Sequence, residues 1–289
     1  MIDPGLSGKV VLITGANHGI GAATARAFAA QAARVALTYY REPARYSAAE
    51  MQAARAAGIG GEPLYHAQQQ QSAEPRAAEI RDRGGVAVAR PADLADPANI
   101  PALFDWCEAA LGPVDVLVNN HTHGVLETFD PALTTTMGFP VTLVSPAEID
   151  RHFAVNARAV ALLMAEYVRR YLARGAGAGA IINISTDAAH AHVANVSYAA
   201  SKHAIESYSR SAAAELGKYG IRVNIVAPGP VQTGYITPAA EAEIAAGTPL
   251  GRVGRPDDIA DVILFLASTA ARWLTGQLIY VGGGWRMGQ

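Results

Sequence analysis

Short apolar runs rich in β-branched residues alternate with alanine-rich stretches along the whole chain of 289 residues. The apolar runs have strand length and few polar interruptions, which is typical of parallel strands buried on both faces. They lie at residues 9–14, 34–38, 86–89, 114–118, 180–185, 221–226 and 277–281. Helical stretches between them include 21–32, 146–173 and 257–267. The alternation predicts an α/β fold over residues 1–289: a single doubly wound domain with a seven-stranded, mainly parallel sheet and helices on both faces.

Two connections are longer than such a fold needs. Residues 41–85 contain a capping-box pattern from Ser47 to Glu50 and a run of four glutamines at 68–71, which we expect to be solvated. Residues 124–144 lead into Ser145 and Pro146, a helix start with proline at the first helical position. Long ordered loops at the carboxyl edge of a parallel sheet often shape a binding site.

Charge and cysteine content limit the class of protein. The formal net charge is −2, so no basic surface for nucleic acid is expected. Cys107 is the only cysteine, which excludes an internal disulfide, fits a reducing compartment and at helical spacing predicts a buried thiol. No apolar run reaches the roughly 18 residues of a membrane span, and the first residues lack signal-peptide character. We therefore expect a cytoplasmic protein with neither nucleic-acid nor membrane partners.

A glycine-rich loop, TGANHGIG at residues 14–21, follows the first strand and opens a helix. Gly15 permits a tight turn, Gly19 lets the backbone approach a phosphate, and Gly21 allows close packing of helix on strand. The helix N-terminus offers free N–H groups to an anion. The loop indicates a dinucleotide site of the Rossmann type, although three glycines alone also suit a purely structural turn.

Tyr198 and Lys202 stand four residues apart in the helical stretch SYAASKHA. One turn of helix places both side chains on the same face. An ammonium beside a phenol stabilises the phenolate and lowers its pKa, which makes the phenol a better proton donor and acceptor near neutrality. The alternative interpretation is a solvated stripe on the helix surface.

Three further polar residues are candidates for the same site. Ser185 ends a predicted strand 13 residues before Tyr198, where its hydroxyl projects into the ligand crevice and can donate to a substrate oxygen. Its neighbour Thr186 is the second candidate donor, and a strand-end turn is the structural alternative. Asn156 lies inside an apolar helix, and a buried amide there needs partners; a purely structural role at a helix bend is the alternative.

The pattern TGxxxGIG followed by Tyr-x-x-x-Lys resembles the short-chain dehydrogenase/reductase (SDR) family, particularly its 3-oxoacyl-ACP reductase-like members. Other family landmarks occur in order over nearly the whole chain apart from the two long connections: ADL at 92–94, VNN at 118–120, NIS at 183–185, APGPVQT at 227–233 and LTGQ…VGGG near the C-terminus. The resemblance implies catalytic roles for Asn156, Ser185, Tyr198 and Lys202.

The resemblance also implies a nicotinamide cofactor. Tyr39 or Tyr40 occupies the end of the second strand, where a carboxylate would repel a 2′-phosphate, and Arg41 follows, with Arg45 further on. His18, in the glycine-rich loop, stands where many NADP-preferring members of the family are similarly basic. We therefore favour NADP(H) over NAD(H), although Arg41 can instead pair with Glu42 or point into water. The implied cofactor-binding residues are Gly15, Asn17, His18, Gly19, Ile20, Gly21, Tyr39, Tyr40, Arg41, Asp93, Leu94, Asn119, Tyr198, Lys202, Pro228, Gly229, Val231 and Thr233.

The activity that the resemblance implies is hydride transfer between NAD(P)H and a small-molecule ketone or ketoacyl carbonyl, giving a secondary alcohol, or the reverse. Tyr198 exchanges the proton, Ser185 polarises the carbonyl, Lys202 anchors the ribose, and Asn156 holds a water. A dinucleotide-binding regulator with little turnover is the alternative. A sugar-nucleotide epimerase or dehydratase fits less well, because its glycine spacing and larger C-terminal part are missing.

One departure from the family pattern affects the expected pocket. The chain reads NNHTHG where relatives read NNAG, which places His121 and His123 near the site; no metal is expected there. We expect His121, His190 and His192 to face the substrate, with a solvated position as the alternative, together with Tyr235 in a lid over residues 234–251. The resemblance further implies a homotetramer, with the helices of Asn156 and Tyr198 packing between subunits and the C-terminal strand at another contact.

Overall fold

The computed structural model describes residues 3–134, 140–175 and 177–285, so part of the second long connection lies outside it. Seven parallel strands form one sheet in the order β3-β2-β1-β4-β7-β8-β9. They are β1 (Val10–Thr14), β2 (Arg34–Tyr39), β3 (Val86–Pro91), β4 (Val116–Asn119), β7 (Gly179–Ile184), β8 (Ile221–Pro228) and β9 (Leu278–Val281). The order reverses between β1 and β4, which opens a ligand crevice at the carboxyl edge. The sequence-based fold class is confirmed.

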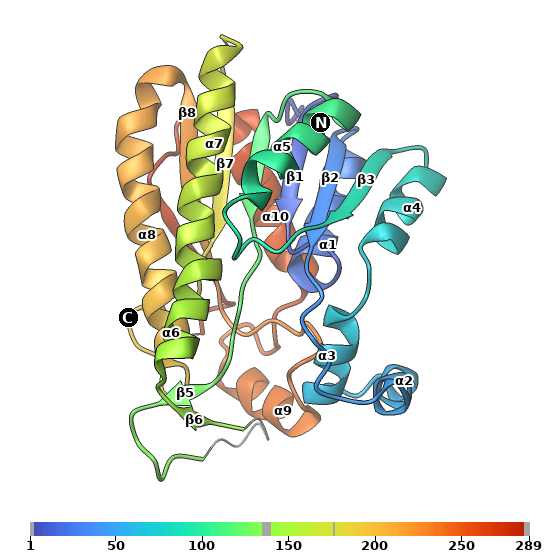
Figure 1. The fold of residues 1–289 in the computed structure, drawn as a ribbon, viewed down its shortest axis with the longest axis vertical. Helices are drawn as coiled ribbons and strands as arrows, with labels where there is room; N and C mark the ends of the chain where they lie inside the picture. The colour runs from blue at the N-terminus through green and yellow to red at the C-terminus, as the bar shows by residue number, and fades with distance from the viewer. Residues whose placement is uncertain (1–2, 135–139, 176, 286–289) are drawn as a thin grey trace.

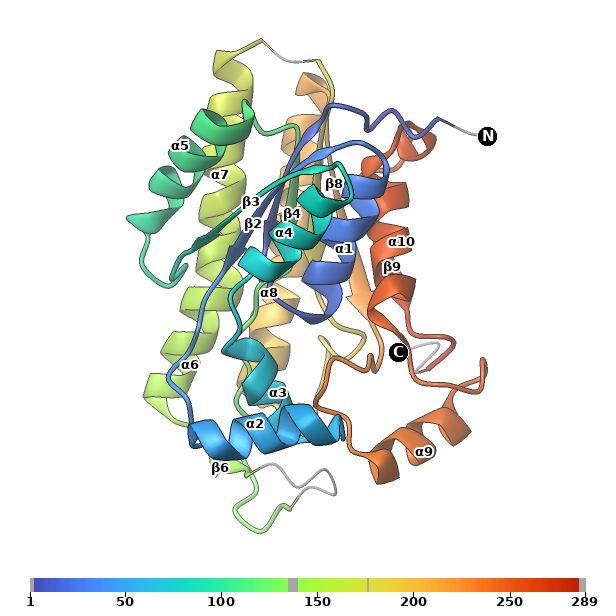
Figure 2. The same ribbon diagram turned by 90° about the vertical axis from the view of Figure 1, so that its right-hand side faces the viewer.

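Helices cover both faces of the sheet, as Figure 2 shows edge-on. One face packs against α1, α4 and α10 and the other against α5, α7 and α8, each around its own apolar core. These helices are α1 (Gly19–Ala30), α4 (Glu74–Asp82), α5 (Asn99–Leu111), α7 (Ala159–Ala173), α8 (Val196–Leu216) and α10 (Pro256–Ala267), with 3₁₀ turns at Gly217–Tyr219 and Thr269–Ala271. Cys107 is buried in α5, as predicted.

The predicted helix over 146–173 is interrupted by a wide turn. It consists of α6 (Pro146–His152), a π-helical segment (Phe153–Arg158) and α7. Ser145 caps α6 by accepting a hydrogen bond from the Glu148 N–H at 3.2 Å. π-Helical turns frequently occur at functional sites, and this one carries the buried amide of Asn156.

The two long connections gather at the carboxyl edge of the sheet, in the lower part of Figure 1. There the first forms α2 (Ala48–Ala57) and α3 (Glu62–Gln69), before α4 packs on the face of the sheet, and the capping box of Ser47 is present. The second contributes β5 (Glu127–Thr128) and β6 (Thr142–Leu143), a small separate sheet. With α9 (Pro238–Gly247) they extend the molecule beyond the sheet.

The glutamine run at 68–71 is half-buried, so the expected solvation is only partial. The side-chain amide of Asn17, in the glycine-rich loop, donates hydrogen bonds to the backbone carbonyls of Gln69 at 3.0 Å and Gln71 at 3.1 Å. The first long connection is therefore fastened to the predicted phosphate-binding loop.

Candidate active site

The glycine-rich loop has the constrained backbone that its sequence predicts. Gly15 and Gly19 have φ angles of +64° and +54°, the left-handed region that favours glycine. A Cβ atom on Gly21 would lie 2.2 Å from the carbonyl oxygen of Gly15, so only glycine lets α1 pack against the loop. The first turn of α1 thus presents its N–H groups at the carboxyl edge of β1.

A cavity of about 780 Å³ opens beside this loop, within the range of small-molecule and cofactor sites. It runs from the end of β2, past the glycine-rich loop, to the N-terminal half of α8. The predicted cofactor residues in its wall are Gly15, Asn17, His18, Gly19, Ile20, Tyr39, Tyr40, Asp93, Leu94, Tyr198, Lys202, Pro228, Gly229, Val231 and Thr233. An elongated cleft floored by glycine backbone and the end of a helix fits a dinucleotide.

Three predicted cofactor residues lie outside the cavity wall. Gly21 serves helix packing instead. Asn119 is buried in β4, where its amide donates to the Asn183 side chain at 2.8 Å. Arg41 is exposed and its guanidinium stacks on the Tyr39 ring at 5.9 Å, whereas Glu42 faces the cavity. The first of the two arginines on which the cofactor preference was based therefore does not line the cavity.

Tyr198 and Lys202 share one face of α8 and both line the cavity, so they are not a surface stripe. The ammonium lies 5.6 Å from the centre of the Tyr198 ring, is almost fully buried and donates to the carbonyl of Ile184 at 2.9 Å. Burial lowers the pKa of Lys202 to about 7. The cation that was expected to activate the phenol thus carries only part of a charge near neutrality.

The pKa of Tyr198 is raised, not lowered as the sequence suggested. Burial is the main cause, followed by the negative charge that Tyr235, Tyr65 and Asp187 develop nearby. A hydrogen bond with the Thr122 side chain acts in the opposite direction. Tyr198 is therefore held in its protonated form, the form that donates a proton.

Ser185 lies at the carboxyl end of β7 and lines the cavity, but its hydroxyl proton is used within the protein. It donates a 2.8 Å hydrogen bond to Glu206, a fully buried carboxylate one turn beyond Lys202 on α8. Thr186 is half-buried in the cavity wall and makes only long contacts, 3.3 Å to the Asp187 carboxylate and 3.4 Å from the Ala188 N–H. Of the two hydroxyls, that of Thr186 makes the longer and weaker hydrogen bonds within the protein.

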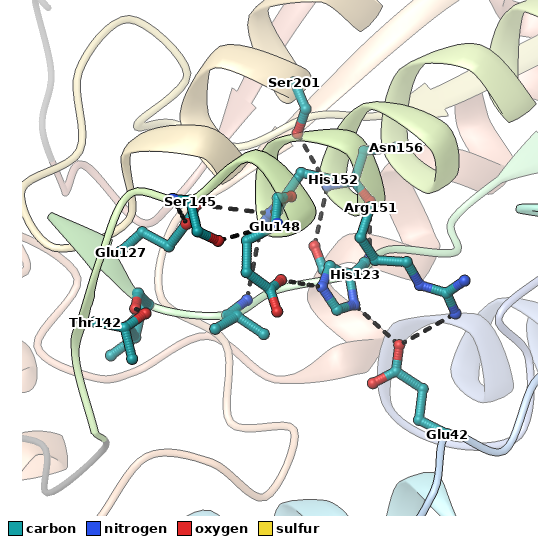
Figure 3. Close-up of polar contacts among 12 residues, drawn as sticks. Glu42, His123, Glu127, Thr142, Ser145, Glu148, Arg151, His152, Asn156 and Ser201 are labelled. Carbon is teal, nitrogen blue, oxygen red and sulfur yellow. Dashed lines mark hydrogen bonds and ion pairs between the residues drawn. The ribbon is translucent and has the colours of Figure 1, made fainter.

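Asn156 fastens the loop after β4 to α8 (Figure 3). Its amide donates to the His123 carbonyl and to the Ser201 hydroxyl, both at 2.9 Å, and its oxygen accepts from the His123 N–H at 2.7 Å. The buried amide is therefore satisfied by protein partners. The water relay toward Lys202 stays a prediction.

The predicted histidines have different surroundings. His121 borders the cavity, but both ring nitrogens bond to protein: Nδ1 to the Thr14 hydroxyl at 2.7 Å and Nε2 to the Val155 carbonyl at 3.0 Å. Burial, with Lys202 nearby, lowers the pKa of His121 to about 3. His190 is exposed and outside the cavity wall, whereas His192 is part of it.

His18 was expected to favour a phosphate through its charge. Burial lowers its pKa to about 4, so the ring is neutral at physiological pH. Its ring meets the Tyr65 ring edge-on, with centroids 5.7 Å apart. His18 therefore shapes the cavity without contributing a positive charge.

The first long connection and the predicted lid form a joint cover over the cavity. The Gly61 N–H donates to the Gly234 carbonyl at 2.9 Å, and the rings of Tyr65 and Tyr235 meet edge-on at 6.0 Å. Both tyrosines line the cavity, so the Tyr235 expectation fits its position. Tyr65 and Glu206 are two site residues that the sequence analysis did not name. No spacing in α3 indicates Tyr65, whereas Glu206 follows Lys202 by four residues, which places it on the same helix face.

Comparisons with known proteins agree with this geometry. Residues 9–62 match the short chain dehydrogenase family and residues 47–286 match the family described as Enoyl-(Acyl carrier protein) reductase. A short-chain type dehydrogenase/reductase of Picea abies is 34% identical, covering 96% of this chain and 93% of its own length. The 7alpha-hydroxysteroid dehydrogenase of Escherichia coli K12 is 32% identical, with 96% and 94% covered.

Solved structures show the same fold. A blue fluorescent protein from a metagenomic library, in complex with NADPH, has a TM-score of 0.74 at 32% identity, covering 98% of this chain and 99% of that one. A short-chain type dehydrogenase/reductase from Mycobacterium marinum has a TM-score of 0.74 at 28% identity, with 97% and 96% covered.

A nucleotide cleft at the switch point of a parallel sheet, with a tyrosine and a lysine facing it, defines a dinucleotide-dependent oxidoreductase. The chain belongs to the short-chain dehydrogenase/reductase family and is an oxidoreductase that uses NAD(P). Within the described ranges, no helix is long and apolar enough to cross a membrane.

Proposed function

We propose that this oxidoreductase reduces the carbonyl of a ketone or ketoacyl compound to a secondary alcohol with NADPH, or catalyses the reverse. The observation that supports this function most strongly is the position of Tyr198 and Lys202. They share one face of α8, and that face lines the same cavity as the glycine-rich loop. A reduced nicotinamide bound there supplies a hydride. The protein has to orient the two reactants and supply a proton.

Tyr198 is the proposed proton donor. Its raised pKa keeps the hydroxyl protonated until charge develops on the substrate oxygen, and the proton then passes to that oxygen. Lys202, anchored on the Ile184 carbonyl at 2.9 Å, holds a second N–H toward the cleft, where a ribose hydroxyl would accept it. Oxidation of the alcohol reverses these steps.

We propose Thr186, rather than Ser185, as the hydroxyl that polarises the carbonyl. A hydroxyl has a single proton, and that of Ser185 is donated to Glu206. Thr186 faces the cavity with only long polar contacts. Ser185 then acts as a positioning residue that joins the end of β7 to α8.

NADP(H) remains the proposed cofactor, with Arg45 rather than Arg41 as the proposed partner of the 2′-phosphate. Arg45 lines the cavity, is half-exposed and lies 3.9 Å from Glu62, its partner in a loose ion pair. Its guanidinium is suited to a 2′-phosphate. The NADPH bound to the metagenomic relative is consistent with this choice.

The cavity favours an uncharged substrate. Six carboxylates but only three lysine or arginine side chains line its described wall, and one of those three is Lys202. The substrate end is apolar and aromatic, with Tyr65, Tyr235 and Trp285 in the wall. We propose a compact apolar or aromatic ketone, because a polyanionic carrier group would face repulsion.

A homotetramer remains the proposed assembly. Phe153, Leu162, Leu172 and Tyr208 are all more than a third exposed on the outer surfaces of the π-segment, α7 and α8, where the family resemblance places one interface. Tyr280 of β9 is 46% exposed, at the second expected contact. Light scattering with size-exclusion chromatography tests this, and a monomer at micromolar concentration contradicts it.

The test of the function is a screen of ketones with NADPH and NADH in parallel, following cofactor absorbance. Oxidation of NADPH by at least one apolar ketone is expected. Tight NADPH binding without turnover on any carbonyl compound would instead favour the dinucleotide-binding regulator.

A further inference from the structure

Two histidines and a glutamate meet at the rim of the cavity, outside the Tyr198 site (Figure 3). His123 comes from the loop after β4, and Glu148 and His152 lie one turn apart on α6. One ligand atom of each lies within 4.8 Å of the others. Both imidazoles are buried, and their ring centroids lie 4.7 Å apart. Imidazole and carboxylate ligands in this number suit a divalent transition metal.

The second nitrogen of each ring is held as in a metal site. His123 Nδ1 bonds to the Glu42 carboxylate at 2.9 Å, and His152 Nδ1 bonds to the Glu148 carbonyl at 2.8 Å. Metal-bound histidines almost always donate their other N–H to such an acceptor, which directs the free lone pair at the ion. The lone pair of His152 therefore lies on Nε2, which accepts only a long 3.3 Å contact from the Val125 N–H.

On His123, Nε2 faces the Glu148 carboxylate at 3.0 Å. With Nδ1 already donating to Glu42, a proton between Nε2 and Glu148 requires the ring to be an imidazolium. A metal ion at the same place satisfies both Nε2 and the carboxylate while the ring stays neutral. The ligand atoms of the site are then His123 Nε2, His152 Nε2 and a carboxylate oxygen of Glu148.

A buried carboxylate supplies independent support for a cation here. Glu127 is fully buried; its Oε1 accepts from the Ser145 N–H at 3.0 Å, and its Oε2 has no hydrogen-bond partner in the described part of the chain. That oxygen lies 3.9 Å from His152 Nδ1. An unpaired buried carboxylate is costly without a nearby positive charge.

We propose that His123, Glu148 and His152 form a binding site for a divalent metal ion of the zinc class. The ion fastens the loop after β4 to α6 at the edge of the cleft. Thr122, which bonds to Tyr198, precedes His123 in that loop, so the site positions the proton donor without touching substrate. The sequence-based expectation of no metal considered only the neighbouring His121 and His123. Glu148 and His152 follow some 25 residues later, so no local spacing linked them to His123.

The experiment uses full-length protein without a histidine tag, stripped with EDTA and then titrated with zinc chloride by calorimetry. We expect about one zinc ion per chain and a higher melting temperature with zinc than without it. Glu148→Gln and His152→Ala should each weaken binding by at least about tenfold. His203→Ala is the matched control, because His190, His203 and Glu206 form the other His–Glu group with metal-ligand spacing among the described residues.

Three outcomes would overturn the proposal: no stoichiometric zinc in the wild-type protein, unchanged binding in both ligand variants, or loss of binding in His203→Ala alone. Melting of each stripped variant against stripped wild type separates loss of the ligand from loss of the fold. Glu148→Gln keeps the size of a half-buried side chain, so it remains informative if His152→Ala fails to fold.

Discussion

The hydroxyl of Ser185 donates to Glu206 across 2.8 Å, joining the end of β7 to the helix that carries Tyr198. Glu206 is fully buried, so Ser185 provides one of the few polar partners of a carboxylate in the core. The one hydroxyl proton of a residue expected to act on the substrate is thus directed at a core carboxylate. The proposal that Thr186 polarises the carbonyl and Ser185 acts as a positioning residue rests on this relationship.

Thr186→Val should lower kcat by about 100-fold or more, the usual effect of removing one donor to a developing oxyanion, and leave the KM for NADPH unchanged. Ser185→Ala should mainly cost stability, about 1–3 kcal/mol, because the buried carboxylate loses its donor. Steady-state kinetics and thermal unfolding of both variants measure this. The reverse assignment would appear as a large kcat loss in Ser185→Ala with little change in Thr186→Val.

Arg45→Ala should raise the KM for NADPH by about tenfold and leave that for NADH nearly unchanged, because a single charged contact to the extra phosphate is removed. Arg41→Ala is the matched control, since its guanidinium lies outside the cavity wall. Initial rates with each cofactor give the two constants. Selective loss of NADPH affinity in Arg41→Ala instead would show that the exposed arginine turns toward the cofactor.

Gly60→Ala should loosen the cover formed by the first long connection and the lid. A Cβ atom there would lie 1.9 Å from the carbonyl oxygen of Ile236, so the two backbones must separate. We expect a higher KM for the ketone and a loss of about 1–3 kcal/mol in stability. Gly217→Ala, with open space around its Cβ position, should change neither. Equal KM values in Gly60→Ala and wild type would mean that the cover does not contact the substrate.

The buried Lys202 should make stability depend on pH. Its pKa is about 7 in the folded protein and about 10.4 when unfolded, so the unfolded chain binds the extra proton between these values. Stability should therefore rise with pH from about 7 to 10, while below pH 7 the full cost of the buried charge remains. Lys202→Met should be more stable than wild type at pH 6 by a margin that narrows toward pH 9.5. Denaturant unfolding at pH 6 and pH 9.5 measures the difference in stability between the two proteins. A difference that stays constant between these pH values would contradict the buried charge.

The fold was largely predictable because periodicity and glycine placement act locally. All seven predicted strands occur within a few residues of their expected bounds, and the glycines at 15, 19 and 21 have the predicted backbone roles. The order of the strands is not encoded in any local pattern. Nor is the π-turn at Asn156, where the alanine-rich pattern predicts an ordinary helix.

Side-chain direction was the part that the sequence did not provide. Arg41 and Ser185 are at the expected positions, but stacking on Tyr39 and a buried glutamate decide where they point. The direction of the Tyr198 pKa shift likewise depends on burial and on the nearby Tyr65 and Tyr235, which come from distant segments. Contacts between residues far apart in the chain settle these features.

Replacing Tyr198 by phenylalanine is the sharpest test of the proposed proton donor. Tyr198→Phe should still bind NADPH with near wild-type affinity, measured by the change in cofactor fluorescence, and lose nearly all ketone reduction, about 100-fold or more. Turnover within a few fold of wild type, with binding intact, would contradict the assignment of this phenol as the proton donor.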